Sequence, residues 1–239
     1  MTLPEYLGIG EGSAAAVVGC GGKTSLIELV AAMLPGKKVL VSPTAKMFPI
    51  KAGNVTLCET LRQCGEHEPQ AGIQCLGILN AATGKLEALP EKTLASLIPR
   101  YDAALLEADG SRGLPCKGWL ANEPVVPPFC THTIGIVTMN PLGMPATEKN
   151  VHRLPEFLSL TGLGPGEAIT EQALEAMACS PRGMFKNSVG LKYLIVNQVE
   201  DEGAASAAVS FLVAIKEKHP GYFERLLYGS VRLNQWQEV

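Results

Sequence analysis

The stretch Gly19-Cys20-Gly21-Gly22-Lys23-Thr24-Ser25 decides the fold, because it joins two patterns of different period. The five residues before it, Ala14 to Val18, are all apolar, as in a buried strand. The residues after it, Leu26 to Val30, read as the start of an amphipathic helix. The order of strand, glycine-rich turn and helix predicts an α/β fold with this turn at the carboxyl end of a strand.

The chemistry of the turn predicts a phosphate site. Glycines at a strand-to-helix turn let backbone N–H groups point at a phosphate, and the helix N-terminus adds partial positive charge. In nucleotide sites of this kind the lysine binds the phosphates and the next hydroxyl binds Mg²⁺, which here is the role of Thr24. We expect the following loop residues to hold the phosphates of ATP or GTP: Gly19, Gly21, Gly22, Lys23, Thr24 and Ser25.

The match to the pattern G-x-x-x-x-G-K-[ST] is incomplete. Val17 stands where that pattern has its first glycine, and Val18 stands where a variant, K-G-G-x-G-K-[ST], has an additional lysine. The alternative is a glycine-rich turn without a ligand. Three glycines followed by Lys-Thr at a helix start favour the phosphate site.

Length and composition place the chain among globular proteins of ordinary charge. It has 239 residues, of which 46% are hydrophobic and 18% charged, with a net charge of −3. We expect one domain over 1–239, with no basic surface for nucleic acid, because no surplus of cations exists. The first residues do not read as a secretory signal, and no apolar stretch has the ~20 residues needed to cross a bilayer, so we expect a cytoplasmic protein without a membrane partner.

Seven cysteines without a C-x-x-C pair do not describe a disulfide framework or a standard zinc site. We expect reduced thiols, in preference to a metal site built from the irregularly spaced Cys58, Cys64, His67 and Cys75. Cys20, inside the loop, is either a redox-sensitive or selenium-contacting thiol or a small residue that the turn tolerates; the second interpretation is favoured.

Apolar runs of strand length recur with helical patterns between them, as a buried parallel sheet requires. The expected strands are 14–18, 39–42, 73–79, 103–107, 133–138 and 193–197, and the expected helices are 23–34, 170–177 and 206–219. A hairpin around 80–85 is expected at the sheet edge. The prediction is a three-layer α/β sandwich like that of P-loop NTPases, with a mostly parallel sheet and long loop insertions at about 110–130 and 140–168.

Two carboxylates follow the expected strand 103–107 and supply a second part of the site. An acid at the end of a strand beside the phosphate loop holds Mg²⁺ in such proteins, and Asp109 is the first choice, together with Thr24. Glu107 is the alternative, as a metal ligand or as the group that orients an attacking water, and alternation along the strand allows both acids to share one ion. Arg112 or Lys117 either stabilises charge on the transferred phosphoryl group or is a surface cation.

Two further loops complete the predicted site. Thr44 and Lys46 follow the second expected strand and are predicted to face the phosphates. Asn197-Gln198-Val199-Glu200-Asp201 resembles the guanine-reading N-K-x-D signature, with Gln198 in place of lysine. Asn197 is predicted to fix the loop, and one of the acids would accept the N–H donors of guanine, so ATP and GTP both stay open.

These residues together resemble the YqeC family, described as accessory or selenium-cofactor biosynthesis proteins of selenium-dependent molybdenum hydroxylases. The resemblance rests on these blocks: 19–25, 43–46, 107–113 with Lys117 and 123–124, 151–153, 183–186 and 197–199. Pro43 and Ala45 depart from a family tendency towards threonines, and Gln198 from lysine. The resemblance implies a P-loop protein in hydroxylase maturation. It also places His152, Arg153 and Lys186 on a second functional surface, where His152 is a ligand, an acid–base group or, as favoured here, a structural residue.

Three functions follow from this pattern. The leading one is an Mg²⁺-dependent NTP-hydrolysing accessory protein that uses ATP or GTP and acts on a molybdenum hydroxylase or its cofactor. Its predicted catalytic residues are Lys23, Glu107, Asp109 and Arg112. A small-molecule kinase is less favoured. Kinases of this fold usually present several arginines on a closing lid, whereas the candidates here are scattered along the chain: Arg100, Arg112, Arg153 and Arg182. The third is a non-catalytic carrier that grips a phosphate-bearing cofactor.

Overall fold

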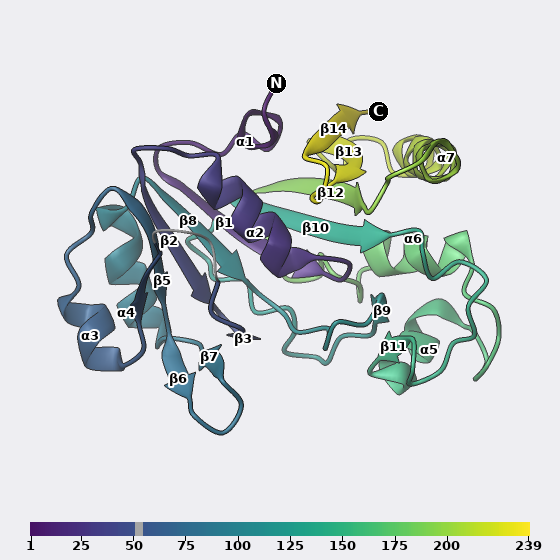
Figure 1. Ribbon diagram of the computed structural model, residues 1–239. Helices are drawn as coiled ribbons and strands as arrows, with labels where there is room; N and C mark the ends of the chain where they lie inside the picture. The colour runs from purple at the N-terminus through teal and green to yellow at the C-terminus, as the bar shows by residue number, and fades with distance from the viewer. Residues whose placement is uncertain (51–54) are drawn as a thin grey trace.

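A nine-stranded sheet forms the centre of the computed structural model, which describes residues 1–50 and 55–239 (Figure 1). Neighbouring strands pair in parallel, except that β14 runs antiparallel to β13. The strands follow one another across the sheet as β14 (Gln235–Glu238), β13 (Arg225–Ser230), β12 (Leu191–Asn197), β10 (His132–Thr138), β1 (Ser13–Gly19), β8 (Ala103–Glu107), β2 (Lys38–Pro43), β5 (Gly72–Leu76) and β4 (Val55–Cys58).

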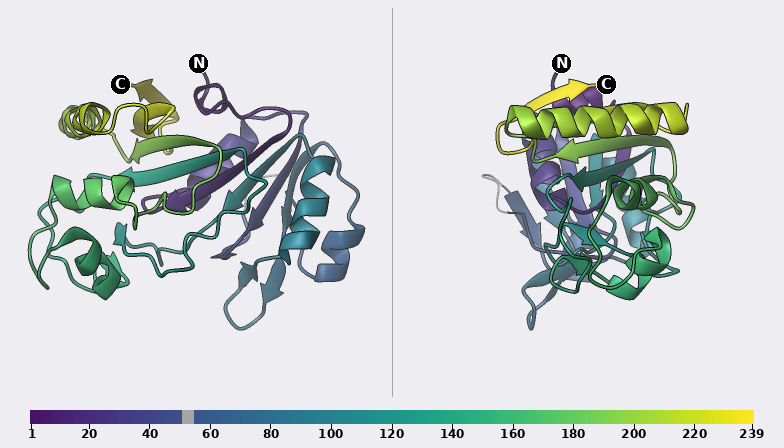
Figure 2. Two further views of the ribbon diagram at one scale, coloured as in Figure 1. Left: turned by 180° about the vertical axis from the view of Figure 1, so that it is seen from behind. Right: turned by 90° about the vertical axis from the view of Figure 1, so that its right-hand side faces the viewer.

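Helices cover both faces of this sheet, because its strands are apolar on both sides. Ala15 and Val17 of β1 pack in the cluster that holds α1 (Leu3–Tyr6) and α2 (Lys23–Ala32), whereas the alternate residues of β1 pack in the opposite cluster. The helices on that second face are α3 (Leu61–Glu66), α4 (Glu91–Leu97), α5 (Leu154–Thr161), α6 (Glu171–Cys179) and α7 (Glu202–Lys218) (Figure 2). The predicted three-layer, mostly parallel α/β sandwich is confirmed.

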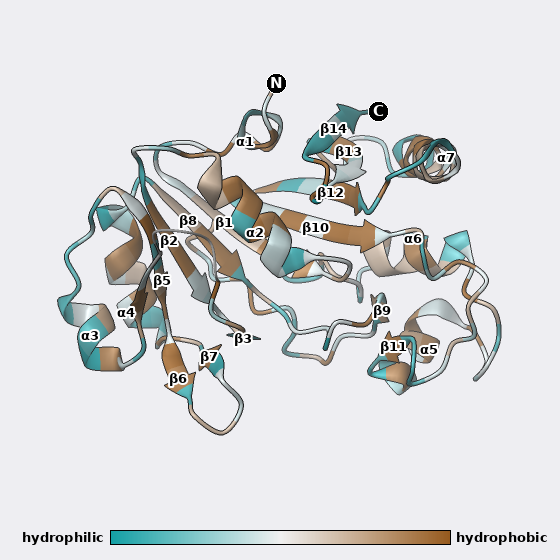
Figure 3. Cartoon of the chain, in the orientation of Figure 1, coloured by the Kyte–Doolittle hydropathy of each residue, from teal (hydrophilic) through white to brown (hydrophobic). Residues whose placement is uncertain are grey.

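The colouring by hydropathy follows this layering. Hydrophobic residues run along the central strands β10 and β12, and hydrophilic residues dominate α3 and the edge strand β14 (Figure 3). Among the helices described, none combines the length and the apolar character needed to cross a membrane.

The expected strands over 14–18, 39–42, 103–107, 133–138 and 193–197 correspond to β1, β2, β8, β10 and β12. The expected strand 73–79 was wrong, since it divides at Gly77 into β5 and β6 (Ile78–Asn80). Gly77 allows a close approach there, because a Cβ on it would lie 2.8 Å from the Cβ of Leu86. The sequence does not predict the edge strands β4 and β14 or the neighbouring strand β13, because their short runs lack the two-sided apolar pattern of the central strands.

The hairpin is present, but its predicted position was wrong. Strand β7 (Lys85–Glu87) pairs with β6 on one side and with β3 (Lys46–Met47) on the other, in a separate three-stranded sheet rather than at the edge of the large sheet. This arrangement carries Lys46 and Lys85 to the carboxyl side of the central strands.

The three expected helices are present with shifted ends. α2 ends two residues before the predicted Leu34. α6 begins after Thr170, whose hydroxyl accepts the N–H of Ala173 as predicted for a cap. α7 begins at Glu202, before the predicted start, because Asp201 caps it by accepting the N–H of Ala204 at 2.8 Å.

The two long segments predicted as loop insertions lie against each other. β9 (Cys116–Lys117), from the first segment, pairs in parallel with β11 (Val151–His152), from the second. Gly118 then passes so close to α5 that a Cβ on it would lie 2.3 Å from the backbone nitrogen of Phe157. The paired segments form a wall beside the carboxyl ends of β1 and β8 (Figure 1).

Candidate phosphate site and adjoining pocket

The glycine loop between β1 and α2 has a shape that side chains would obstruct. Gly19 has φ +98°, and a Cβ on it would lie 2.3 Å from the carbonyl oxygen of Ile136. Gly22 is the left-handed N-cap of α2, and its Cβ would lie 2.8 Å from Nδ2 of Asn197. The glycines therefore serve the backbone geometry of the loop, as expected for a phosphate-binding turn.

The loop presents backbone donors. In the part of the chain that the structure describes, the N–H groups of Gly21, Gly22 and Lys23 have no protein acceptor, as is usual for the first turn of a helix. Gly19 differs, because its N–H donates to Oδ2 of Asp109 at 3.1 Å. The donors that can meet an anion therefore begin at Gly21, two residues later than the sequence suggested.

Asn197 supports the loop from the end of β12, which was its predicted role. Its Nδ2 donates to the carbonyl oxygen of Gly21 at 2.8 Å, and its Oδ1 accepts the N–H of Val231 at 2.9 Å. Gln198 occupies the place of the lysine in the N-K-x-D signature, and its side-chain oxygen accepts a hydrogen bond from the Thr138 hydroxyl at 3.0 Å.

Both acids considered for guanine recognition have protein partners. Glu200 accepts from the Ser230 hydroxyl at 3.0 Å and pairs with Arg232. Asp201 caps α7 through Ala204. Both carboxylates are therefore already engaged within the protein, Glu200 with two side chains and Asp201 through Oδ1.

Thr24 and Glu107 form a close pair at the mouth of the loop. The Thr24 hydroxyl donates to Oε2 of Glu107 at 2.6 Å. Burial raises the pKa of Glu107, although Lys23 and the Thr24 hydrogen bond act against that rise. Both residues line a pocket of about 550 Å³, together with Ser25. A hydroxyl and a carboxylate beside unpaired N–H donors are the ligand types that hydrated Mg²⁺ takes next to phosphates, so the residues fit that ion.

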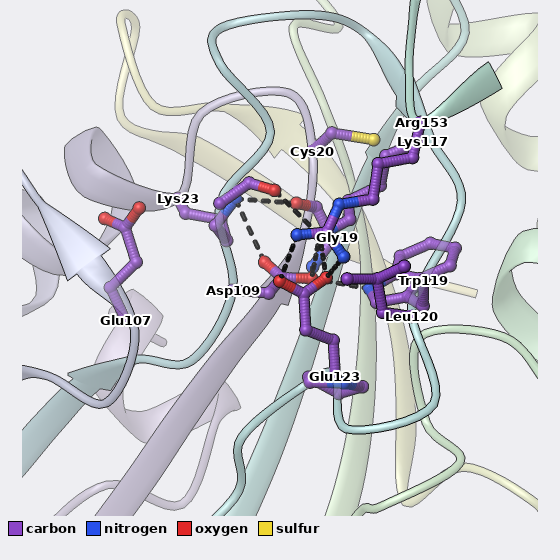
Figure 4. A network of polar contacts seen from close by, with 12 residues as sticks. Gly19, Cys20, Lys23, Glu107, Asp109, Lys117, Trp119, Leu120, Glu123 and Arg153 are labelled. Atoms are coloured by element: carbon purple, nitrogen blue, oxygen red, sulfur yellow. Dashed lines mark hydrogen bonds and ion pairs between the residues drawn. The ribbon is translucent and has the colours of Figure 1, made fainter. Parts of the chain in front are cut away.

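Asp109 lies in a different, buried environment (Figure 4). Its Oδ1 is 3.2 Å from Nζ of Lys23, and its Oδ2 accepts from Trp119 Nε1 at 2.7 Å and from Lys117 Nζ at 3.3 Å. Burial alone would raise its pKa, but the charges of Lys23 and Lys117, together with the hydrogen bonds from Trp119 and the Gly19 N–H, hold the pKa of Asp109 below its usual value. Asp109 and Glu107 therefore have different hydrogen-bond partners: Glu107 is the last residue of β8, and Asp109 lies beyond the end of that strand.

Lys23 is also bound inside the protein. Its ammonium donates to the carbonyl oxygen of Gly19 at 2.7 Å, and its side chain is 4% exposed. Burial acts to lower its pKa, but Asp109 and Glu107 reverse that effect, so the pKa of Lys23 is raised and the group stays charged.

Lys117 extends the same network away from the loop. Its side chain is fully buried, and its Nζ donates to the Gly110 carbonyl at 2.7 Å and lies 3.4 Å from Oε2 of Glu123. Glu123 in turn accepts two bonds from the Arg153 guanidinium, at 2.6 and 2.8 Å. The alternative that Lys117 is a surface cation was wrong, because its side chain is fully buried and its ammonium contacts Asp109, Gly110 and Glu123.

The remaining predicted residues divide between the pocket and the core. Arg112 lines the 550 Å³ pocket, and so does Lys46, which pairs with Glu87 at 2.7 Å. Thr44 is buried and donates to the carbonyl oxygen of Val125 at 2.6 Å, so its hydroxyl is used within the fold. The sequence did not suggest Lys85, which enters the pocket from the hairpin.

A second pocket, of about 780 Å³, adjoins the first and shares Lys46, Lys85 and Arg112 with it. His152 and Arg153 line this second pocket, whereas Lys186 does not; its ammonium donates to the Leu120 carbonyl. Of the three residues expected on a second surface, two therefore lie together.

The cysteines do not form a metal cage. Within residues 1–50 and 55–239, no group of three or more His, Cys, Asp or Glu side chains is arranged to hold a metal ion. Cys20 is buried, its thiol donates to the Pro115 carbonyl at 3.0 Å, and burial raises its pKa to about 12. Its thiolate is scarce at neutral pH, which agrees with a packing role.

Comparisons with known proteins place this geometry in a family. A family model described as "YqeC protein" matches residues 15–155, which span the glycine loop, Glu107, Asp109 and Arg153. A protein of Escherichia coli strain K12, described as "Uncharacterized protein YqeC", is 34% identical over 177 residues, which cover 72% of this chain and 69% of that protein. With more than half of the chain matched by the one and over two thirds aligned by the other, the chain belongs to the YqeC family.

Proposed function

We propose that the protein binds a nucleoside triphosphate with Mg²⁺ at the glycine loop and hydrolyses it. The observation that carries the proposal is the Thr24–Glu107 pair, 2.6 Å apart, beside the unpaired N–H groups at the start of α2. Donors for phosphate oxygens and oxygen ligands for a cation meet there at the carboxyl edge of a parallel sheet, where such folds bind ligands.

Each residue has a role in this proposal. Gly21, Gly22 and Lys23 donate their N–H groups to phosphate oxygens. Thr24 and Glu107 hold Mg²⁺, which supplies positive charge against the phosphates. Glu107 thus replaces Asp109, the first choice from the sequence, as the carboxylate of the metal site, because the oxygens of Asp109 face Lys23, Lys117 and Trp119.

Two cations act on the terminal phosphate. The Lys23 ammonium exchanges Asp109 and the Gly19 carbonyl for a phosphate oxygen, and it enters this exchange protonated, because Asp109 and Glu107 raise its pKa against the effect of burial. Arg112 lies across the pocket and stabilises charge that develops during cleavage. Glu200 and Asp201 already accept hydrogen bonds within the protein, so they do not favour guanine over adenine. ATP and GTP are therefore both substrates to test.

Calorimetric titration with Mg²⁺ and non-hydrolysable analogues of ATP and GTP tests binding. Thr24→Ala should weaken the Mg²⁺-dependent affinity about tenfold or more, as loss of a charged-group contact does. Lys92→Gln, at an exposed position of α4, is the control and should bind normally. At a ligand concentration 100 times Kd, the wild type should gain about 2.7 kcal/mol of stability, and absence of stabilisation by either nucleotide overturns the proposal.

Release of inorganic phosphate from ATP and GTP tests hydrolysis separately. Turnover that requires Mg²⁺ and falls in Glu107→Gln supports it. Binding without turnover, with and without a molybdenum hydroxylase present, would instead support the non-catalytic carrier.

We further propose, from the family resemblance, that this activity serves maturation of a selenium-dependent molybdenum hydroxylase. In a host that makes such a hydroxylase, deletion of the gene should lower hydroxylase activity and selenium content without lowering the amount of hydroxylase protein. The wild-type gene should restore both, and a Thr24→Ala gene should not. Unchanged activity and selenium content in the deletion strain would refute this role.

A small-molecule kinase is the second candidate function. It is favoured by the 780 Å³ pocket, which opens beside the nucleotide pocket and shares three cations with it. A kinase needs such a place for an acceptor next to the terminal phosphate, whereas a simple hydrolase does not.

A further inference from the structure

We propose that the 780 Å³ pocket is a second ligand site, which takes a small molecule carrying a phosphate monoester group and an apolar body. The proposal deepens the proposed function, on which it rests for the nucleotide next door. The pocket itself is defined by side chains on two long segments and the hairpin, independently of any nucleotide.

The shape of the pocket fits a small molecule. About 780 Å³ is within the usual range for ligand pockets of proteins. One wall comes from β11 and the start of α5, and Lys46 and Lys85 approach from the small sheet. Apolar side chains make up part of the lining and would contact an apolar body: Leu114, Val125, Val151, Leu154 and Pro155.

The charge of the pocket selects an anion. Its lining includes four cations, Lys46, Lys85, Arg112 and Arg153, against the carboxylates of Glu123 and Glu148. The whole chain carries a net charge of −3, so this excess of cations is a local feature. Glu123 holds Arg153 through two hydrogen bonds and thereby fixes the guanidinium plane at the pocket wall.

The pKa of His152, which lines the pocket, is lowered in part by the same positive charges. Burial lowers its pKa to about 4, and the charges of Lys117, Arg153 and Arg112 add to that effect against the opposing charge of Glu123. At neutral pH the imidazole is therefore neutral. A dianion bound beside it would offset those cations and favour the protonated ring.

The position of the shared cations relates the two sites. Lys46, Lys85 and Arg112 line both pockets, so an anion in the second pocket would lie next to the terminal phosphate of a nucleotide in the first. Lys46 already pairs with Glu87, whereas Lys85 and Arg112 make no ion pair among the described residues. A phosphate group therefore suits this place better than a neutral one, because it supplies these two cations with a counter-charge.

The test uses the full-length chain labelled with ¹³C-histidine and phenyl phosphate as the probe. His152→Gln identifies the His152 ring signal among the four histidines. Titration with phenyl phosphate should move that signal and shift its titration to higher pH. Phenyl phosphate should have the same effect when the glycine loop is saturated with the Mg²⁺ complex of a non-hydrolysable nucleotide analogue. Benzyl alcohol, the control without a phosphate group, should leave the His152 signal unchanged.

Variants check which side chains bind the probe. Lys85→Gln should weaken phenyl phosphate binding about fivefold or more, the effect of losing one charge contact, and Arg112→Gln gives a second, independent check. Lys149→Gln removes the same charge from an exposed position that lines neither pocket, and it should bind the probe as the wild type does.

The outcomes separate this proposal from the proposed function. A shift of the His152 signal with phenyl phosphate, in a protein that binds no nucleotide, would support the second site and refute the nucleotide site. Nucleotide binding with an unmoved His152 signal would overturn the second site alone. Loss of the probe on addition of the nucleotide analogue would overturn it too, because the probe would then occupy the glycine loop.

Discussion

The ammonium of Lys23 lies 3.2 Å from Oδ1 of Asp109, with side chains only 4% and 0% exposed. The side chain of Lys23 is thus buried against Asp109. Asp109 also contacts Lys117, and Lys117 in turn contacts Glu123 (Figure 4). A phosphate in the pocket at the loop would compete with Asp109 for the Lys23 ammonium. Occupation of the loop should therefore alter the buried network.

Trp119 should report that change, because its Nε1 binds Asp109 at 2.7 Å. In a Trp236→Phe background, where Trp119 is the remaining tryptophan, addition of Mg²⁺ and a nucleotide analogue should change the emission of Trp119. Lys23→Gln should abolish the change. An unaltered spectrum at a nucleotide concentration shown by calorimetry to saturate the protein would contradict the link.

Asp109→Asn should destabilise the fold strongly. It leaves the buried ammonium groups of Lys23 and Lys117 without their carboxylate, and breaking a buried pair in this way costs about 3–5 kcal/mol. Glu107→Gln is the matched control: its hydrogen bond to Thr24 can be kept, so the loss should be about 1 kcal/mol or less. Urea unfolding measures both, and equal losses would refute the assignment of Asp109 to the structural network.

Gly22→Ala should damage the loop more than Gly36→Ala. Both residues have positive φ, and each substitution carries backbone strain of about 1–2 kcal/mol. A Cβ at Gly22 also meets Asn197 Nδ2 at 2.8 Å, whereas nothing lies within 4 Å of one at Gly36. Nucleotide affinity should fall about tenfold in Gly22→Ala and stay unchanged in Gly36→Ala, as measured by calorimetry. The same affinity in both variants would show that the loop tolerates the side chain.

His152 should make the protein sensitive to acid. Its pKa is lowered from 6.5 to about 4 in the fold, so between these values the unfolded chain binds a proton that the native protein does not. Stability therefore falls as pH falls through this window. His152→Gln lacks this proton uptake, and its stability relative to the wild type should increase from pH 7 to pH 4.5. Urea midpoints over that range test the expectation, and a constant difference would contradict it.

The sequence by itself predicted the central architecture. Two-sided apolar runs can satisfy their backbone and side chains only inside a parallel sheet, which is why β1, β2, β8, β10 and β12 were recognisable. Strands β4, β13 and β14 were missed because their short runs lack the two-sided apolar pattern. The division of 73–79 was missed because it depends on the close approach of Gly77 to Leu86 of β7.

The candidate site shows the same division. Gly19 to Thr24 could be found from the sequence because backbone conformation and helix start are local properties, whereas the partners of Glu107 and Asp109 could not. Only Ala108 separates these acids in the chain, yet one faces Thr24 and the other faces Lys23, Lys117 and Trp119. The resemblance placed His152 and Arg153 on a second surface, but only the pairing of β9 with β11 shows that they line a pocket next to the glycine loop. The sequence determined which groups are available, and tertiary packing, through burial and the neighbouring charges, decided which of them face the ligand.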